Sequence, residues 1–457
     1  MPLSSLISES ITSTKYLQFV RFRDLQFWDY NTYFREDIQN HNHPTVKLEE
    51  LIKQRKWFIT IDEAILYKRP TVKLYGKWVF LRDEIIGKDI KVKKQQVCRW
   101  NDLLVAEIDA KVWGFGIIPD YLEWAIVSSH YFLFEVDRTR LSLDFLSIYL
   151  KTEEFQKQVQ ATGSTNYAAI RPSHFLGYNI SLPDLATQSR IVREYQDRIS
   201  EAARLEQLAR DGEKQIESYL IDALGITIED REKKQGINFV RFKDLERWDV
   251  KNLISENWVW AKFEMRKVWS FLQSLNADNN GKGLRLDSKN TPTERFQYIG
   301  MEHIEKETGK LLETVNVNGK EIKSQTVKVP VWYFLYGKLR PYLNKYWYNH
   351  NSERVIASSE FFVFSVNEEK IAKQYFILIL ASHIIQKQIA DLMAWARMPR
   401  INETNFKNLE IPLPPLSIQS EIVTYIESIK STIATARAES ERLRSEARES
   451  FERELFV

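Results

Sequence analysis

One segment of the chain occurs twice, and the second copy lies almost half a chain away from the first. "FVRFRDLQFWDY" occupies residues 19–30, and "FVRFKDLERWDV" occupies residues 239–250, 220 positions later (239 − 19). Two further segments repeat in the same order: "IVSSHYFLF" and "IASSEFFVF" at an offset of 230, and "ISLPDLATQSRIV" and "IPLPPLSIQSEIV" at an offset of 231. A period above two hundred residues is too long for a solenoid. The sequence therefore predicts two domains of one design in a 457-residue chain.

The repeated segments enclose a middle that barely matches between the two halves. The offset drifts from 220 to 231, so the second copy is longer by about a small loop. Repeated segments that enclose a divergent middle favour two recognition domains for two different ligands. The alternative is a simple duplication that produced a bilobal enzyme. The doubled opening segment is the expected start of each frame, with three aromatic pairs buried in it: Phe19/Phe239, Phe22/Phe242 and Trp28/Trp248.

Composition limits the class of protein. The formal net charge is only +3, so a nucleic-acid surface would have to be a local patch. The single cysteine, Cys98, excludes an internal disulfide framework and a cysteine-based zinc site, and it favours a reducing compartment. The first residues, "MPLSSLISES", lack the features of a signal peptide, and no apolar run reaches the ~18 residues of a membrane span. We therefore expect a cytoplasmic protein.

A long polar helix is predicted after each "LP.L" segment, where Pro183 and Pro414 stand just ahead of the helix. Apolar residues follow steps of four and three, which is a heptad seam. The seam residues that we expect to pair the helices or to dock a partner are Ile422, Ile426, Ile429, Ile433 and Leu443 in the second copy and Ile191, Tyr195, Leu205 and Ile216 in the first. Arg198 and Gly212 interrupt the first seam.

Each helix would span nearly 40 residues, or roughly 55 Å. A single amphipathic helix of that length is poorly stable alone, and the intervening domain sends the chain back, so an antiparallel pair is predicted. A spacer and a docking surface for partner subunits are equally compatible with the pattern.

Motifs for catalysis are mostly missing from the sequence. It has no GxxxxGK[ST] phosphate loop, no GxGxxG after a strand, and no Asn-Pro-Pro-aromatic segment of the kind that amino-methyltransferases use. Asp102, Asp109 and Lys111 in "NDLLVAEIDAK" loosely resemble the core of a metal-dependent nuclease. The second copy has Gly337 and Leu339 at the positions of Glu107 and Asp109, which favours a strand that merely carries charges.

Basic side chains interleaved with aromatic ones recur in both halves. Lysine and arginine suit phosphate contacts, whereas arginine, asparagine and glutamine reach base edges. The candidate DNA-binding residues are Lys68, Arg69, Lys91, Lys93, Lys94 and Arg99 in the first half and Lys282, Arg285, Lys289, Lys338, Arg340, Lys345, Arg397 and Arg400 in the second. Asn166 and Ala169 stand where the second copy has Arg397 and Arg400, so we do not expect these arginine contacts in both halves.

The whole chain resembles the specificity subunit of Type I restriction–modification systems. The resemblance rests on "LEIPLPPLSIQSEIVTYI" and "NISLPDLATQSRIVREY" at the helix starts, and on "LYGKLRPYLNK", "VIASSEFFVF" and "RMPRINETNFKNL" within the second half. It implies an α+β fold with two mixed target recognition domains, separated by two long helices that form an antiparallel coiled coil with a pseudo-two-fold repeat. The implied limits are 1–185 and 226–415 for the domains, and 186–225 and 416–457 for the helices.

The same resemblance implies a non-catalytic subunit that reads a bipartite, interrupted target in double-stranded DNA. It would recruit two methyltransferase subunits and, through the complex, the restriction subunits. S-adenosylmethionine, ATP and magnesium would be bound by those partners, and the chain itself would hold no cofactor or metal. A specificity subunit of a Type II-like system is one alternative, and the nuclease built on Asp102, Asp109 and Lys111 is another.

Overall fold

A computed structural model describes residues 42–73, 77–108, 113–161, 169–229, 258–278, 280–286, 292–322, 325–350, 352–392 and 399–456. The chain forms two compact units. The first comprises Met1–Leu205 with Ala438–Val457, and the second comprises Glu206–Arg437. Both copies of the doubled opening segment, and the aromatic pairs expected to be buried there, lie outside the described residues.

A four-stranded antiparallel sheet forms the frame of each unit, and its strand order is the same in both. In the first unit the order is β2 (Ile52–Arg55), β10 (Tyr131–Val136), β7 (Leu103–Ala106) and β8 (Phe115–Ile117). In the second unit it is β15 (Leu272–Leu275), β22 (Phe361–Val366), β19 (Phe334–Gly337) and β20 (Tyr346–Tyr348). The sequence repeat is therefore a repeat of sheet topology.

Two smaller strand pairs also repeat. The first joins the beginning and the end of each unit: β1 (Thr45–Lys47) with β11 (Asn179–Ser181), and β14 (Met265–Lys267) with β23 (Glu410–Pro412). The second lies within each unit: β6 (Lys94–Val97) with β9 (Ile126–Val127), and β18 (Thr326–Lys328) with β21 (Val355–Ser358). A further hairpin of β12 (Thr227–Glu229) and β13 (Trp258–Trp260) follows the first long helix.

The paired strands locate the length difference between the copies. Ile52 pairs with Val136 and Leu272 pairs with Val366, so the first frame strand keeps the offset of 220. Gln96 pairs with Val127 and Val327 pairs with Ala357, where the offset has become 231 (327 − 96). The segment 276–324 is thus 11 residues longer than its counterpart 56–93 (231 − 220). We call these two segments the inserts.

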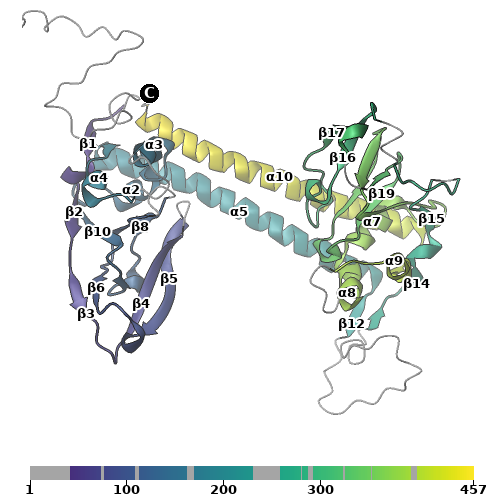
Figure 1. Ribbon diagram of the computed structural model, residues 1–457, viewed down its shortest axis with the longest axis horizontal. Helices are drawn as coiled ribbons and strands as arrows, with labels where there is room; N and C mark the ends of the chain where they lie inside the picture. Colours follow the sequence, from purple (N-terminus) through teal and green to yellow (C-terminus); the bar gives the residue numbers. More distant parts are fainter. Residues whose placement is uncertain are drawn as a thin grey trace, which may run out of the picture. The chain divides into compact units, whose positions relative to one another are not determined.

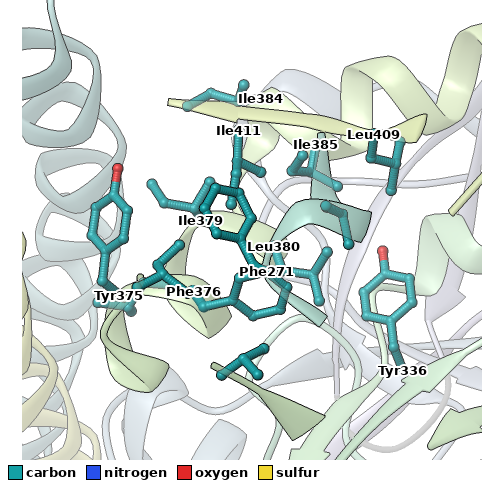
Figure 2. Packing of buried hydrophobic residues seen from close by; sticks show 14 of the residues in the cluster. Phe271, Tyr336, Tyr375, Phe376, Ile379, Leu380, Ile384, Ile385, Leu409 and Ile411 are labelled. Atoms are coloured by element: carbon teal, nitrogen blue, oxygen red, sulfur yellow. The ribbon is translucent and has the colours of Figure 1, made fainter. Parts of the chain in front are cut away.

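One face of each sheet packs against helices. In the first unit these are α2 (Leu143–Tyr149), α3 (Glu153–Ala161) and α4 (Pro172–Leu176), and in the second α7 (Lys373–Ala381), α8 (His383–Leu392) and α9 (Glu403–Asn408). Strand alternation sends Leu103 and Phe134 toward the helices of the first unit. Figure 2 shows the matching core of the second unit, where Tyr336 and Phe376 lie among isoleucine and leucine side chains. The buried run that the sequence contains at 375–385 is this helical layer.

The opposite face of each sheet is covered by the insert. In the first unit, Leu104 and Leu133 join a cluster with Val72 and Val79 of the insert. In the second unit, the matching positions Leu335 and Val363 contact a cluster with Leu284 and Ile299 instead. The covering strands are β3 (Phe58–Thr60), β4 (Leu66–Lys73) and β5 (Lys77–Ile86) in the first unit, and β16 (Arg295–Ile299) and β17 (Val315–Asn318) in the second. Each unit therefore has a shared helix–sheet frame and a different outer layer.

The two long helices are α5 (Leu185–Leu224) and α10 (Leu416–Leu455), drawn in teal and yellow in Figure 1. In the first unit, the start of α5 lies against the end of α10: Arg190 pairs with Glu454 at 2.8 Å, and the Tyr195 and Phe451 rings lie 5.9 Å apart. In the second unit, the end of α5 lies against the start of α10, with the Tyr219 and Tyr425 rings 4.1 Å apart. Both contacts are antiparallel, and the predicted α+β fold with an antiparallel helix pair is confirmed.

The predicted seam residues differ in burial. Ile191, Ile422, Ile426, Ile429 and Ile433 are buried, whereas four others are half-buried: Tyr195, Leu205, Ile216 and Leu443.

Gly212 is not an interruption, because a Cβ atom at this position would lie 2.9 Å from Cγ1 of Ile433. The glycine lets the two helices approach closely within the second unit. Arg198 is half-buried, and its guanidinium donates to the Glu194 carbonyl oxygen at 3.1 Å within its own helix.

No helix in the described part of the chain is both long and apolar enough to cross a membrane.

A buried glutamine fastens the start of each long helix to its own unit. Gln188 accepts a hydrogen bond from the Ser142 amide at 2.8 Å and donates to the Pro183 carbonyl oxygen at 2.8 Å. Gln419, at the offset of 231, accepts from the Ala372 amide and donates to the Pro414 carbonyl oxygen, both at 2.8 Å. The "LATQS" and "LSIQS" segments therefore repeat because the same backbone groups need the same partner.

We expect Gln419→Met to lower the free energy of unfolding of the second unit by about 2–4 kcal/mol, because two backbone groups lose their partner in a buried place. Urea unfolding of the full chain measures the change. Ser420→Ala, at the exposed neighbouring position, is the control. Equal midpoints for the two variants would contradict the role given to the glutamine.

Candidate nucleic-acid interface

The insert of the first unit carries a two-stranded ribbon made of β4 and β5 (Figure 1). Arg69 lies on it and forms a bidentate pair with Asp83, at 2.7 and 2.8 Å. The hydrogen bond from Arg69 holds the pKa of the Asp83 carboxyl below its usual value. Lys68 is exposed, and its ammonium donates to the Tyr121 carbonyl oxygen at 2.9 Å. The ribbon thus carries two predicted DNA-binding residues, Lys68 and Arg69, and Arg69 forms an ion pair within the protein.

A bulge in this ribbon exposes Arg82, which is not among the DNA-binding residues predicted from the sequence. Arg69 pairs with Asp83 and Pro70 pairs with Leu81, so Arg82 is an extra residue without a cross-strand partner. Bulges bend a strand and redirect side chains. The Arg82 side chain is 50% exposed, and its Nε lies 3.2 Å from the carboxylate of the adjacent Asp83. The sequence "FLRDEII" gives no sign of a bulge, because an extra residue is visible only in the pairing of the strands.

The lysines after the ribbon lie at the edge of the same insert. Lys91 is exposed. Lys93 forms an ion pair with Glu63 at 3.1 Å and donates to the Gly87 carbonyl oxygen at 2.9 Å, so it stabilises the fold of the insert. The Lys94 ammonium lies 5.1 Å from the ring centre of Phe58. Among these three lysines, Lys91 is the one for which the described part of the chain shows neither an ion pair, a hydrogen bond nor a ring contact of its side chain.

A cluster of aromatic rings and guanidinium groups lies beside the ribbon. The carbon of the Arg99 guanidinium is 4.8 Å from the Trp57 ring, and the Trp57 and Trp124 rings meet edge to face at 5.4 Å. Trp124 has a left-handed backbone conformation (φ 67°) and is 61% exposed. A hollow lined by Leu66 and Lys68 of the ribbon, and by Ile65 just before it, also borders this cluster. Exposed aromatic faces with adjacent cations suit contacts with sugar and base.

The carboxylate proposed for a nuclease is engaged elsewhere. Asp102 is buried, forms an ion pair with Arg55, and accepts a hydrogen bond from the Arg99 amide at 2.9 Å. Asp109 and Lys111 lie outside the described residues. Glu107 contacts His130 at 2.9 Å. The strand register matches β7 and β19 at an offset of 231, so Glu107 corresponds to Lys338, and not to Gly337 as the sequence alignment had it. Within the described ranges, no group of histidine, cysteine and carboxylate side chains could hold a metal ion.

The second unit brings its predicted basic residues into different surroundings. Lys282 and Arg285 are exposed on the insert. Arg340 is exposed in a left-handed turn (φ 48°) between β19 and β20. Lys345 donates to the Met301 carbonyl oxygen at 2.6 Å, so its ammonium supports the insert from the frame. Lys289 and Arg397 lie outside the described residues.

Two further cations of the second unit are paired within the protein. Arg400 forms a bidentate ion pair with Glu360, with both distances 3.0 Å. The Lys338 ammonium donates to the Ser359 carbonyl oxygen at 2.9 Å and lies 4.9 Å from the Phe362 ring. Burial lowers the pKa of Lys338 below its usual value. These contacts lie around Ser359 and Glu360, directly before the inner strand β22, and favour a role in holding the fold.

Three left-handed backbone positions recur in both units, one of them being the pair Trp113 (φ 65°) and Asn344 (φ 47°), two residues before β8 and β20 at an offset of 231. Asn101 (φ 70°) and Trp332 (φ 73°) stand two residues before the central strands β7 and β19, at an offset of 231. Trp124 and Arg354 (φ 59°) stand before β9 and β21, at an offset of 230. Left-handed conformations are costly for such residues and persist where the surrounding structure enforces them. The shared frame therefore includes its turns as well as its strands.

A family model for the Type I restriction modification DNA specificity domain matches residues 345–445. This range begins beside β20 and runs through the helix layer of the second unit into α10. This part of the chain therefore matches the DNA specificity domain of Type I restriction–modification systems. The sequence resemblance to this family is confirmed.

Part of the chain is similar to the MjaX specificity subunit assigned to a type I restriction enzyme of Methanocaldococcus jannaschii. It is 33% identical over 93 residues, which are 20% of this chain and 21% of the relative. The match thus spans about a fifth of the relative's length.

One solved structure shares the fold at a TM-score above 0.5, and two others match with lower scores. A chain from a study of complex assembly and conformational transition of the type I R-M system matches with a TM-score of 0.55 at 14% identity, over 90% of this chain and 97% of the other. The HsdS subunit from Thermoanaerobacter tengcongensis matches with a TM-score of 0.44 at 14% identity, over 90% and 96%. The S subunit from M. genitalium matches with a TM-score of 0.46 at 13% identity, over 92% and 97%.

Proposed function

We propose that this chain is the DNA-reading subunit of a restriction–modification complex, and that each unit recognises one half of a bipartite, interrupted target. The observation that carries this function is the division of each unit into a shared frame and a different outer layer. Two copies of one frame suit a common mode of docking onto DNA, whereas two different layers suit two different base sequences. The match of the second unit to a DNA specificity domain supports the assignment.

The long helices are proposed to dock two methyltransferase subunits and to set the spacing between the half-sites. The exposed apolar side chains of Leu208 and Tyr425 on these helices are consistent with a partner surface. The restriction subunits would join through the complex. S-adenosylmethionine, ATP and magnesium would be bound by these partners, which would also flip and methylate the target base. A cytoplasmic location follows from this function.

The proposal predicts that specificity is modular. Replacing residues 236–410 by the matching part of a relative with a different target should change one half-site of the methylated sequence and leave the other intact. The reason is that this range holds the sheet, the helix layer and the insert of the second unit, and none of those of the first. Sequencing of methylated DNA from cells that carry the exchanged protein measures the outcome. A change in both half-sites, or in neither, would contradict the proposal.

A further inference from the structure

Within the first unit, the charge that could attract DNA is concentrated in the insert. Residues 56–93 contain nine lysines and arginines against five acidic residues, a formal charge of +4, while the whole chain has +3. The rest of the chain therefore sums to about neutral. Because phosphate contacts dominate affinity for DNA, a local excess of positive charge identifies the surface that meets the duplex. The insert of the second unit, 276–324, carries eight residues of each sign.

The shape of the first insert is also suited to DNA. A two-stranded ribbon fits the major groove, where each base pair presents a distinct pattern of donors and acceptors. The ribbon of β4 and β5 is fastened to the sheet by Val72 and Val79 on its inner side. Its outer side exposes Leu66, Lys68 and Phe80. A rigid ribbon with one anchored and one open side can hold its side chains in a fixed register along the bases.

Arg82 has the chemistry of a base-reading residue on this ribbon. Arginine can donate two hydrogen bonds to the O6 and N7 atoms of guanine. The other ribbon arginine, Arg69, has its fork occupied by Asp83 in two hydrogen bonds. The Arg82 contact to Asp83 is made through Nε, so the terminal nitrogens of its guanidinium have no hydrogen bond within the described residues. Arg82 at the bulge therefore keeps its terminal guanidinium nitrogens available for a base, whereas Arg69 is engaged in holding Asp83.

We propose that the bulged β4–β5 ribbon, with Arg82 at its bulge, is the element with which the first unit reads its half-site, and that the insert alone determines the sequence read. This inference rests on the proposed function, and it assigns the reading of bases to the insert of the first unit. The frame positions the insert, because Leu104 and Leu133 present an apolar face to it as Leu335 and Val363 do in the second unit. The frame does not choose the bases.

The chain offers its own exchange partner for a test. Residues 56–93 are replaced by residues 276–324 of the same chain, and in a second variant residues 45–181 are replaced by residues 265–412, which transfers frame and insert together. Each variant is assembled with the methyltransferase subunits and offered a DNA library with both half-sites randomised. Sequencing of the methylated molecules gives the target. We expect both variants to select the second unit's base sequence in both half-sites.

The outcomes separate the two proposals. If the larger exchange changes the first half-site and the insert exchange does not, the insert inference is overturned and the proposed function stands. If the larger exchange leaves the first half-site unchanged, the proposed function itself fails.

A point variant keeps the test decisive where an exchanged insert fails to fold. Arg82→Ala is expected to weaken methylation of the preferred first half-site roughly 10- to 100-fold and to relax base preference at one position of that half-site alone. Arg138→Ala, an exposed arginine on the frame, is the control for the loss of one positive charge. A uniform weakening across all sequences, or an effect no larger than that of Arg138→Ala, overturns the assignment of base reading to the ribbon.

Discussion

Replacing Phe451 and Leu455 together by alanine is expected to lower the free energy of unfolding of the first unit by at least about 5 kcal/mol. Both side chains lie near the end of α10, and both are buried; Phe451 comes 259 residues after Val192, the preceding buried residue of this core (451 − 192). The Phe451 ring lies 5.6 Å from Phe145 of the helix layer. A loss of this size approaches the total stability of an ordinary domain.

Hydrogen bonds at the same helix end add to the effect. The backbone amide of Asn42 donates to the Leu455 carbonyl oxygen at 2.9 Å, and its side-chain amide donates to the carbonyl oxygen of Arg453 at 3.0 Å. Ser181 donates to the Leu455 carbonyl oxygen at 3.4 Å. These contacts satisfy carbonyl groups that a helix end otherwise leaves open. Frayed ends of α10 would release them together with the apolar side chains.

Hydrogen exchange followed by mass spectrometry distinguishes the units in the full-length protein. We expect the amides of β10 (Tyr131–Val136) to lose protection in the double variant, while those of β22 (Phe361–Val366) keep theirs. Glu441→Ala, on the exposed side of α10, is the control and should leave both strands protected. Unchanged protection of β10 in the double variant would contradict the role of the helix end in this core.

The features that could be predicted from sequence are those with a regular spacing. The heptad steps of Ile422, Ile426 and Ile429 are local, and an antiparallel helix pair satisfies them in a simple way. The repeat of "IVSSHYFLF" is also visible by eye, and it contains most of β10 and β22, one of the two inner strands of each sheet. Gly212 was misread because helix propensity alone counts glycine as a defect, whereas the partner side chain Ile433 needs the space.

The candidate interface was harder to predict because it depends on contacts between distant residues. The pairing of Ile52 with Val136 and the bulge at Arg82 are set by tertiary structure, and neither leaves a pattern in the sequence. The sequence shows clusters of basic residues, but it does not show which of them are free to bind DNA. Arg400 forms an ion pair with Glu360, whereas Lys91 is exposed. Charge counts predict a region, and the structure decides which side chains are available.

Asp102→Ala is expected to destabilise the first unit by about 3–5 kcal/mol, because it leaves the Arg55 charge buried without its partner. Arg55 also donates to the Val97 carbonyl oxygen at 2.7 Å, so the guanidinium is held in place and cannot move readily to water. Combining Asp102→Ala with Arg55→Met removes both charges and should recover part of the loss. Denaturant unfolding of the single and double variants measures this coupling.

Variants of Asp102 and Asp109 distinguish a structural role of these carboxylates from the nuclease alternative. If Asp102 serves only the fold, the combined variant should retain DNA cleavage in the reconstituted complex once it is folded, and Asp109→Ala should cleave like the parent protein. Under the nuclease alternative, Asp109→Ala would bind DNA normally and lose cleavage, since a metal-binding acid acts on the reaction and not on affinity. A folded Asp109→Ala protein that binds but does not cleave would therefore place catalysis on this chain and displace the reading of it as a DNA-recognition subunit.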